Sequence, residues 1–316
     1  MRSYLIRRLA FALFLIVAVS SASLVLARLA PGDYADFALP QNATPEQRAQ
    51  YRREHNLDQP IASQYVSWIT HAARLDFGIS LKYGRPVREL IPERAANTAI
   101  LAVTALALAT VVGLALGVVT GSGRGGVAAS AIRSVSLVLL SMPPLLTSLF
   151  LVFAAARTGW LPIAGMRSSD VPSSGAAIDL LRHLIVPAAA LGLPLAAMFE
   201  RLQSQAMREV VGRPFVVATL ARGVPWTRVI WRDALKVSLG PVASVYGLVV
   251  GTLLSGSFAV EVITAWPGLG RLMLEALGSR DVFLVAGCAG AGATFLAIGT
   301  LCSDLALAWV DPRVRQ

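Results

Sequence analysis

Histidine and lysine, which commonly bind metals or phosphates, are few and scattered in this 316-residue sequence, with three histidines and two lysines. The three histidines lack the spacing of metal ligands, and neither lysine follows a glycine as in the Gly-Lys-Ser/Thr motif of a phosphate-binding loop. These residues are His55, His71, His183, Lys82 and Lys236. We therefore predict no catalytic residue, no metal site and no cofactor site in this chain.

Two cysteines and one aspartate lie in the last apolar stretch of the sequence. Cys288 and Cys302 are separated by about 21 Å along a helix, so they cannot form a disulfide with each other. Buried cysteines ordinarily pack as small apolar side chains. Asp304 lies near the inner end of this stretch, where we favour a capping or snorkelling role over proton transfer. An intramembrane hydrolase or a proton-driven carrier is therefore poorly supported.

Composition indicates a membrane protein. Apolar residues make up 55% of the chain and charged residues 15%, whereas soluble domains carry about 25% charged residues. Apolar stretches near the bilayer-spanning length of about 20 residues cover 9–27, 98–120, 134–156, 184–199, 237–260 and 283–310. The fourth stretch is the shortest and contains Pro187 and Pro194. The first is too long for the apolar region of a signal peptide, so we expect it to be retained. The predicted fold class is an all-α polytopic membrane protein with six transmembrane helices.

The distribution of positive charge predicts the orientation. With a cytoplasmic N-terminus, the inside segments hold most of the arginines of the short loops, seven basic residues between 201 and 236 among them. Both termini are therefore expected in the cytoplasm. The net charge of +10 then reflects topology and contact with anionic membrane lipids. Nucleic acid is not an expected partner, because no basic soluble domain with interleaved aromatic residues is present.

The basic loop 203–236 contains a short predicted helix. Pro214 can occupy the first helical position, residues 215–222 supply two turns, Gly223 can form a left-handed C-cap, and Pro225 prevents continuation. A helix of about eight residues is not stable in water by itself. We therefore expect it to dock on another surface, and favour a separate protein.

Residues 31–95 predict a small helical subdomain outside the membrane. Pro31, Gly32 and Asp33 form a turn signal after the first span. Thr44, Pro45 and Gln47 have the spacing of a capping box, and a second helix is predicted over 61–75.

Several motifs then resemble one transporter family in order along nearly the whole chain. They are Leu-Ala-Pro-Gly-Asp at 29–33, Leu-Asp-Gln-Pro at 57–60, Asp-Phe-Gly-Ile-Ser-Leu at 76–81, Gly-Arg-Pro-Val at 84–87, Trp-Leu-Pro at 160–162, Trp-Pro-Gly-Leu-Gly-Arg at 266–271 after Glu261, Arg-Asp at 280–281 and Asp-Pro-Arg at 311–313. With these motifs the chain resembles the membrane-spanning permease subunit of dipeptide/oligopeptide ABC importers. The resemblance implies three parts: an N-terminal tail and first helix (1–30), an extracytoplasmic helical subdomain (31–95) and a transmembrane permease core (96–316).

The resemblance also implies that the short helix is a coupling helix, in the cytoplasmic loop 203–241 between the fourth and fifth spans. The residues implied to contact the ATPase are Phe215, Ala218, Thr219, Leu220, Ala221, Arg222, Gly223 and Val224. Val217 and Leu220 stand where the family commonly has arginine, so this helix is less basic than usual. An ATPase that closes on ATP would move the docked helix and tilt the spans on either side.

Two further sets of residues follow from the resemblance. An extracytoplasmic gate, or a contact with the binding protein, is expected at Glu261, Trp266, Pro267, Gly268, Arg271, Arg280 and Asp281. The alternative is that Arg271, Arg280 and Asp281 are solvated or paired, and Arg271 and Glu275 have the spacing of a helical ion pair. Met142 and Pro143 are expected to line the pore, at a kink caused by Pro143-Pro144.

The predicted function is that of a non-enzymatic transport subunit in the bacterial or archaeal cytoplasmic membrane. It would form half of the pathway for di- and oligopeptides with a second homologous permease. Two ABC ATPase subunits would bind ATP and magnesium, and an extracytoplasmic binding protein would deliver the cargo. Nickel chelates, glutathione or sugars remain alternative cargoes, and a secondary carrier or channel is an alternative class.

Overall fold

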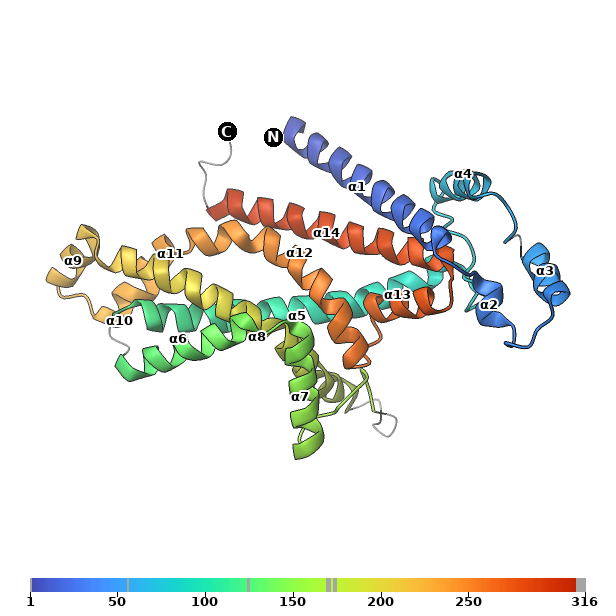
Figure 1. Cartoon of the computed structure of the whole chain (residues 1–316). Coiled ribbons are helices and arrows are strands. Elements are labelled where there is room, and N and C mark those ends of the chain that lie inside the picture. Colours follow the sequence, from blue (N-terminus) through green and yellow to red (C-terminus); the bar gives the residue numbers. More distant parts are fainter. Residues whose placement is uncertain (1, 56, 124–125, 169–171, 173–174, 311–316) are drawn as a thin grey trace. The chain divides into compact units, whose positions relative to one another are not determined.

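The computed structural model describes residues 2–55, 57–123, 126–168, 172 and 175–310, with side chains described over 6–301 apart from 252 and 255 within those ranges. All named elements in these residues are helices, and one isolated bridge pairs Ile79 with Pro86. The chain divides into a first unit, Met1–Thr98 with Pro267–Ala297, and a second unit, Ala99–Trp266 with Ile298–Gln316. Each unit is described by itself (Figure 1).

The first unit contains α1 (Arg2–Leu29), α2 (Tyr34–Ala38), α3 (Pro45–Glu54), α4 (Ile61–Ala72), the start of α5 (Val87–Gly121), α13 (Leu269–Gly278) and most of α14 (Val282–Val310). The predicted capping box at Thr44 is confirmed, since its hydroxyl accepts from the Gln47 amide and the Gln47 side chain accepts from the Thr44 amide. Asp33, which we predicted only as part of a turn, forms a second capping box at the start of α2. The helical subdomain is thus organised by local polar contacts.

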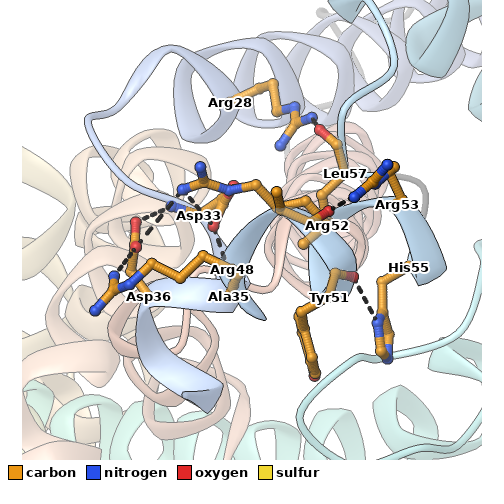
Figure 2. Close-up of polar contacts among 11 residues, drawn as sticks. Arg28, Asp33, Ala35, Asp36, Arg48, Tyr51, Arg52, Arg53, His55 and Leu57 are labelled. Atoms are coloured by element: carbon orange, nitrogen blue, oxygen red, sulfur yellow. Dashed lines mark hydrogen bonds and ion pairs between the residues drawn. The ribbon is translucent and has the colours of Figure 1, made fainter. Parts of the chain in front are cut away.

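Ion pairs hold α2 and α3 together. Arg52 contacts Asp33 at 2.7 Å and Arg48 contacts Asp36 at 2.8 Å, as Figure 2 shows. A separate apolar cluster packs α13 against α14, and Cys288 lies fully buried in it, as expected of a small apolar side chain. The side chains of Cys302 and Asp304 and the motif at 311–313 lie outside the described residues.

The second unit contains the rest of α5, α6 (Gly126–Ser141), α7 (Pro144–Thr158), α8 (Ala176–Val211), α9 (Pro214–Ala221), α10 (Trp226–Arg228), a π-helix η2 (Val229–Ala234), α11 (Leu235–Ser238), α12 (Gly240–Ile263) and the end of α14. Its core joins α5, α8 and α12 through residues such as Leu101, Leu191 and Val249. The shared apolar core makes α8 the central helix of this unit, in contact with α6, α7 and α12.

Among the described residues, four helices are long and apolar enough to cross a membrane, and up to six spans result if each of two bent pairs counts as one. This confirms a polytopic helical membrane protein. Two expected spans differ in detail. The third is not one kinked helix: α6 and α7 meet at 110° at Met142-Pro143, because Pro143 and Pro144 interrupt the backbone hydrogen bonding there (Figure 1). The fourth expected span, 184–199, lies inside a longer helix, since α8 runs on to Val211 with both prolines inside it.

Candidate functional site

The short helix predicted in the basic loop is present as α9, and local chemistry sets both of its ends. Pro214 occupies the first helical position. At the other end Gly223 has φ +82°, and its amide donates to the Leu220 carbonyl at 2.9 Å while the Val224 amide donates to the Thr219 carbonyl at 3.4 Å. This pair of bonds is a Schellman motif, in which the residue after the helix is left-handed. The prediction for Pro214 and Gly223 is therefore confirmed.

One face of α9 packs against the chain itself. Val216 is buried in a cluster with Met207 and Val210 of α8 and with Ile230 of η2, and Leu220 and Val224 pack against the same cluster. We had expected the helix to need a separate protein for its stability. Val216 already anchors the helix within the chain, so the expectation of a separate protein concerns only the other face.

That other face is exposed and largely apolar. Phe215 is 38% exposed and Val217 60% exposed, and Ala218, Ala221 and Arg222 are exposed beside them. The Thr219 hydroxyl donates to the Phe215 carbonyl at 2.8 Å and accepts from Arg222 at 3.2 Å, which orients the cation at the C-cap of the helix. The site thus offers an apolar surface with a positive charge at each end, since the N-cap residue is Arg213.

Buried polar groups connect the neighbouring helices. The Thr120 hydroxyl of α5 donates to the Glu200 carboxylate of α8, and both side chains are buried. One turn further along α8, Gln203 bonds Ser238 of α11 at 2.6 Å. Sequence reasoning missed Glu200 and Gln203, because α8 was expected to leave the membrane at residue 199.

Three glycines allow α5 and α8 to lie in close contact. A Cβ atom at Gly113, Gly117 or Gly121 would come within 2.7 Å of atoms of α8. Small residues four positions apart are typical of closely packed membrane helices. This spacing is visible in the sequence and could have identified the α5–α8 pair.

Of the predicted gate residues, two lie in the second unit. Glu261 and Trp266 are both fully buried, and Trp266 belongs to the core that includes Leu101 and Val260. Their burial leaves no exposed surface for a direct contact with a binding protein in this structure. A role in gating remains a prediction for these two residues.

The other predicted gate residues lie in the first unit. The Asn97 side chain donates to the Pro267 carbonyl at 2.8 Å, and Gly268 precedes α13. The Arg271–Glu275 pair is confirmed at 3.2 Å, and the side chain of Arg271 is 40% exposed. The two remaining residues are Arg280, which has a left-handed backbone, and Asp281, which is fully buried.

The pore-lining pair lies at the corner between α6 and α7. Met142 is partly buried, and Pro143 is exposed and precedes the first turn of α7. The corner is therefore a marked break in the helical path, and pore lining remains a prediction for both residues.

The described side chains include no group of three or more His, Cys, Asp or Glu residues that could hold a metal ion. His183 is buried in α8, where Nδ1 lies 2.9 Å from the Asp179 carbonyl, and the Asp179 carboxylate accepts from Ser168. These polar groups satisfy one another and leave no open coordination site.

Comparison with known proteins agrees with this architecture. Residues 113–316 match the family described as binding-protein-dependent transport system inner membrane component, and residues 1–102 match the N-terminal region of such components. The oligopeptide transport system permease protein AppB of Bacillus subtilis is 28% identical, over 99% of both chains. The dipeptide transport system permease protein DppB of Escherichia coli is 32% identical, over 100% of this chain and 99% of its own.

A third relative is the probable peptide ABC transporter permease protein y4tP of Sinorhizobium fredii, 30% identical over 99% of both chains. The matches cover the N-terminal helices, α9 and the C-terminal helix. The chain therefore belongs to the family of binding-protein-dependent transport system inner membrane components, and it is the permease subunit of an ABC importer, not an enzyme.

Proposed function

We propose that this permease carries di- and oligopeptides across the cytoplasmic membrane of a bacterium or archaeon. The observation that carries the proposal is the full-length similarity to permeases named for dipeptide and oligopeptide transport. The proposed orientation places both termini, α9 and its flanking arginines in the cytoplasm, because the short loops on that side hold most of the positive charge. Residues 31–95 then lie outside.

In this proposal the exposed face of α9 docks on a cytoplasmic ATPase subunit. The apolar surface of Phe215, Val217 and Ala218 suits a hydrophobic groove on the partner, and Arg222 suits a carboxylate at its rim. Two ATPases, a second permease chain and an extracytoplasmic binding protein complete the assembly. ATP and magnesium bind to the ATPases.

The packing of α9 supplies a route for the motion. Displacement of α9 acts on Val216 and its contacts with α8 and η2, and α8 is in turn packed tightly on the glycines of α5. A rigid docking helix would therefore move the spans on either side of the loop, and the proposed pathway between the two permeases would change its access. Met142 and Pro143 are proposed to line this pathway.

Gly223 provides the test of coupling. A side chain there meets no atom within 4 Å, so the effect of Gly223→Val comes from the left-handed backbone, which costs about 1–2 kcal/mol for an L-residue. Gly212→Val is the matched control, because Gly212 also has open space but an ordinary φ of −79°. We expect Gly223→Val to reorient Val224 and Leu220 and to separate α9 from its cluster.

The experiment measures uptake of a labelled dipeptide by cells that lack the chain, carry it, or carry either variant at equal membrane abundance. Peptide import through α9 predicts loss of uptake in the deletion and in Gly223→Val, and normal uptake in Gly212→Val. Unchanged uptake in the deletion would reject dipeptide as the necessary cargo. Loss on deletion with normal uptake in Gly223→Val would reject the coupling role of this glycine.

A further inference from the structure

A cavity of about 410 Å³ lies entirely within the first unit. Its walls come from the last turn of α1, from α2, from the end of α3, from α4, from the segment 76–81 and from the turn between α13 and α14. Sites for small molecules commonly have volumes of about 300–1,000 Å³. The cavity is large enough for a small solute, and it lies in a different unit from α9.

Arg280 lines this cavity with an unusual backbone. Its φ is +57°, in the left-handed region that disfavours residues other than glycine. Within the part of the chain that the structure describes, its guanidinium makes no hydrogen bond or ion pair. Strained backbone at a non-glycine position is concentrated at functional sites. A glycine would relieve the strain here, so the arginine side chain itself needs an explanation.

The next residue fixes this turn. Asp281 is fully buried and accepts hydrogen bonds from the Ser80 hydroxyl at 2.6 Å, from the Lys82 amide at 3.1 Å and from the Leu284 amide at 3.2 Å. The Arg280 amide donates to the Leu277 carbonyl at 3.2 Å. The backbone that carries Arg280 is therefore held from both sides, which fixes the point from which its side chain reaches the cavity.

Further hydrogen-bond donors lie on the cavity wall. The Arg28 guanidinium donates to the Leu57 carbonyl (Figure 2) and has other N–H groups left to offer. His55 and His71 also belong to the wall, but their Nδ1 atoms lie 3.0 and 2.7 Å from main-chain carbonyls, which can only accept, so each Nδ1 hydrogen is already used. The Nε2 atom of a neutral imidazole with its hydrogen on Nδ1 is an acceptor. The Trp68 indole N–H is buried in the wall without a partner among the described residues.

The remaining lining combines one carboxylate with neutral polar side chains, such as Gln59 and Ser67, and with apolar surface. Asp76 supplies the carboxylate of the described wall and accepts a hydrogen bond from the Gly78 amide at 3.1 Å. The apolar part of the wall includes Ile79, Val282 and Phe283. Guanidinium groups pair with carboxylates in a favourable two-bond geometry. Two arginines, one aspartate and apolar side chains together complement a small molecule that carries a carboxylate, an ammonium group and an apolar side chain.

We infer that this cavity is a binding subsite for a short zwitterionic peptide, with the carboxylate held by Arg280 and Arg28 and the ammonium group by Asp76. The apolar side chain of the peptide packs against Phe283 and Ile79. The inference rests on the proposed function, since a peptide is the cargo proposed there and the orientation places the first unit's subdomain outside. It assigns this chain a peptide contact of its own, separate from the binding protein.

The test uses the full chain in nanodiscs of phosphatidylethanolamine and phosphatidylglycerol, without other subunits. Equilibrium dialysis measures binding of labelled alanyl-phenylalanine and of its C-terminal amide, which lacks the carboxylate. We expect the amide to bind about tenfold more weakly, because the partly buried Arg280 guanidinium then lacks its carboxylate partner. Arg280→Gln should weaken binding of the dipeptide by about the same factor and abolish the preference over the amide.

Two more variants keep the test decisive. Arg280→Gly removes the guanidinium while relieving the left-handed strain, so it should fold and show the same loss. Arg53→Gln is the control, because Arg53 lies on α3 outside the cavity and contacts only the Ala49 carbonyl of its own helix. It should leave both affinities unchanged.

Equal binding of dipeptide and amide by the parent chain would overturn the subsite, as would a preference that survives in Arg280→Gly. A phospholipid retained in native mass spectra and lost in Arg280→Gly, without any peptide preference, would overturn it in favour of a lipid headgroup.

Uptake in cells separates the subsite proposal from the proposed peptide import. Uptake that depends on the chain, with no binding in nanodiscs, rejects the subsite alone. Binding with chain-independent uptake supports the subsite and rejects the import of dipeptide.

Discussion

Gln203 of α8 donates a hydrogen bond from Nε2 to the hydroxyl of Ser238 in α11, at 2.6 Å, and both side chains are buried. The two residues stand 35 positions apart and enclose the whole segment that carries α9. The Ser238 hydroxyl in turn donates to the Leu235 carbonyl at 3.0 Å. This bond therefore fixes the two ends of the docking segment to each other.

Ser238→Ala should loosen that segment. The variant leaves a buried amide N–H without a partner, which costs about 1–3 kcal/mol. Faster hydrogen exchange of the backbone amides in 214–236 is expected, with little change in α12. Ser244→Ala is the control, because the exposed Ser244 hydroxyl donates only to the Pro241 carbonyl of its own helix. Equal exchange rates in Ser238→Ala and the parent protein would show that the bond does not hold the segment.

Sequence predicted α9 well because the signals at its ends are local. A proline at the first helical position and a glycine after the last turn act within a few residues, whatever the rest of the fold does. The capping box at Thr44 was predictable for the same reason. The contact between Ser80 and Asp281 was not, because it joins residues 201 positions apart and depends on tertiary packing.

The ends and bends of the membrane spans were predicted less well than α9, because their prediction relied on the positions of charged residues and prolines. The fourth apolar stretch was predicted to end at residue 199, whereas α8 continues past Glu200, whose buried carboxylate accepts a hydrogen bond from Thr120. The Pro143-Pro144 pair was expected to kink one helix, and the residues around it form two. A sequence shows that a proline removes a donor, but the size of the resulting bend is set by the helices that pack around it.

Gly117→Ala should destabilise the second unit. The added Cβ would lie 2.5 Å from Cβ of Gln203 and 2.9 Å from the Glu200 carbonyl oxygen, and neither α5 nor α8 can yield without losing its contacts. Overpacking of this kind costs about 1–3 kcal/mol. A lower thermal unfolding midpoint in detergent is expected, while Gly240→Ala, which meets nothing within 4 Å, should match the parent. A midpoint in Gly117→Ala equal to that of Gly240→Ala would contradict the close packing.

The Tyr83–Glu275 hydrogen bond should make the first unit sensitive to acid. Burial acts to raise the pKa of Glu275, but the Tyr83 hydroxyl and the charges of Lys82 and Arg271 outweigh it, so the pKa lies below its ordinary value of 4.5. The stabilisation is therefore present above pH 4.5 and is lost as the pH falls through the lowered pKa. Burial and the Glu275 carboxylate raise the pKa of Tyr83 to about 12, so a second loss is expected between pH 10 and 12.

Tyr83→Phe should weaken the acid effect, because Lys82 and Arg271 remain beside Glu275, and should remove the alkaline effect, because the titrating hydroxyl is gone. The measurement is the thermal unfolding midpoint of the variant and the parent from pH 3 to 7. At neutral pH the midpoint of the variant should be lower by about a few degrees, and on acidification it should fall less than that of the parent. Tyr51→Phe is the control, since Tyr51 lies in the same subdomain and its hydroxyl does not pair with a carboxylate. An acid profile of Tyr83→Phe that parallels the parent would mean that Glu275 draws its stabilisation from Lys82 and Arg271 alone.

Asp281→Ala should release the segment 76–87 from the turn that precedes α14. Asp281 accepts two hydrogen bonds from this segment, one from the fully buried Ser80 hydroxyl and one from the Lys82 amide. Removing a buried carboxylate and leaving its donors unpaired costs about 3 kcal/mol. Trypsin should cleave after Lys82 faster than in the parent, whereas the bond after Arg85 is protected by Pro86 in every variant. Asp281→Asn keeps one acceptor oxygen, so its cleavage rate should lie between those of Asp281→Ala and the parent. Asp58→Ala changes an exposed residue and should be cleaved at the parental rate. Cleavage of Asp281→Ala no faster than that of Asp58→Ala would show that Ile79 and its apolar neighbours hold the segment without the carboxylate.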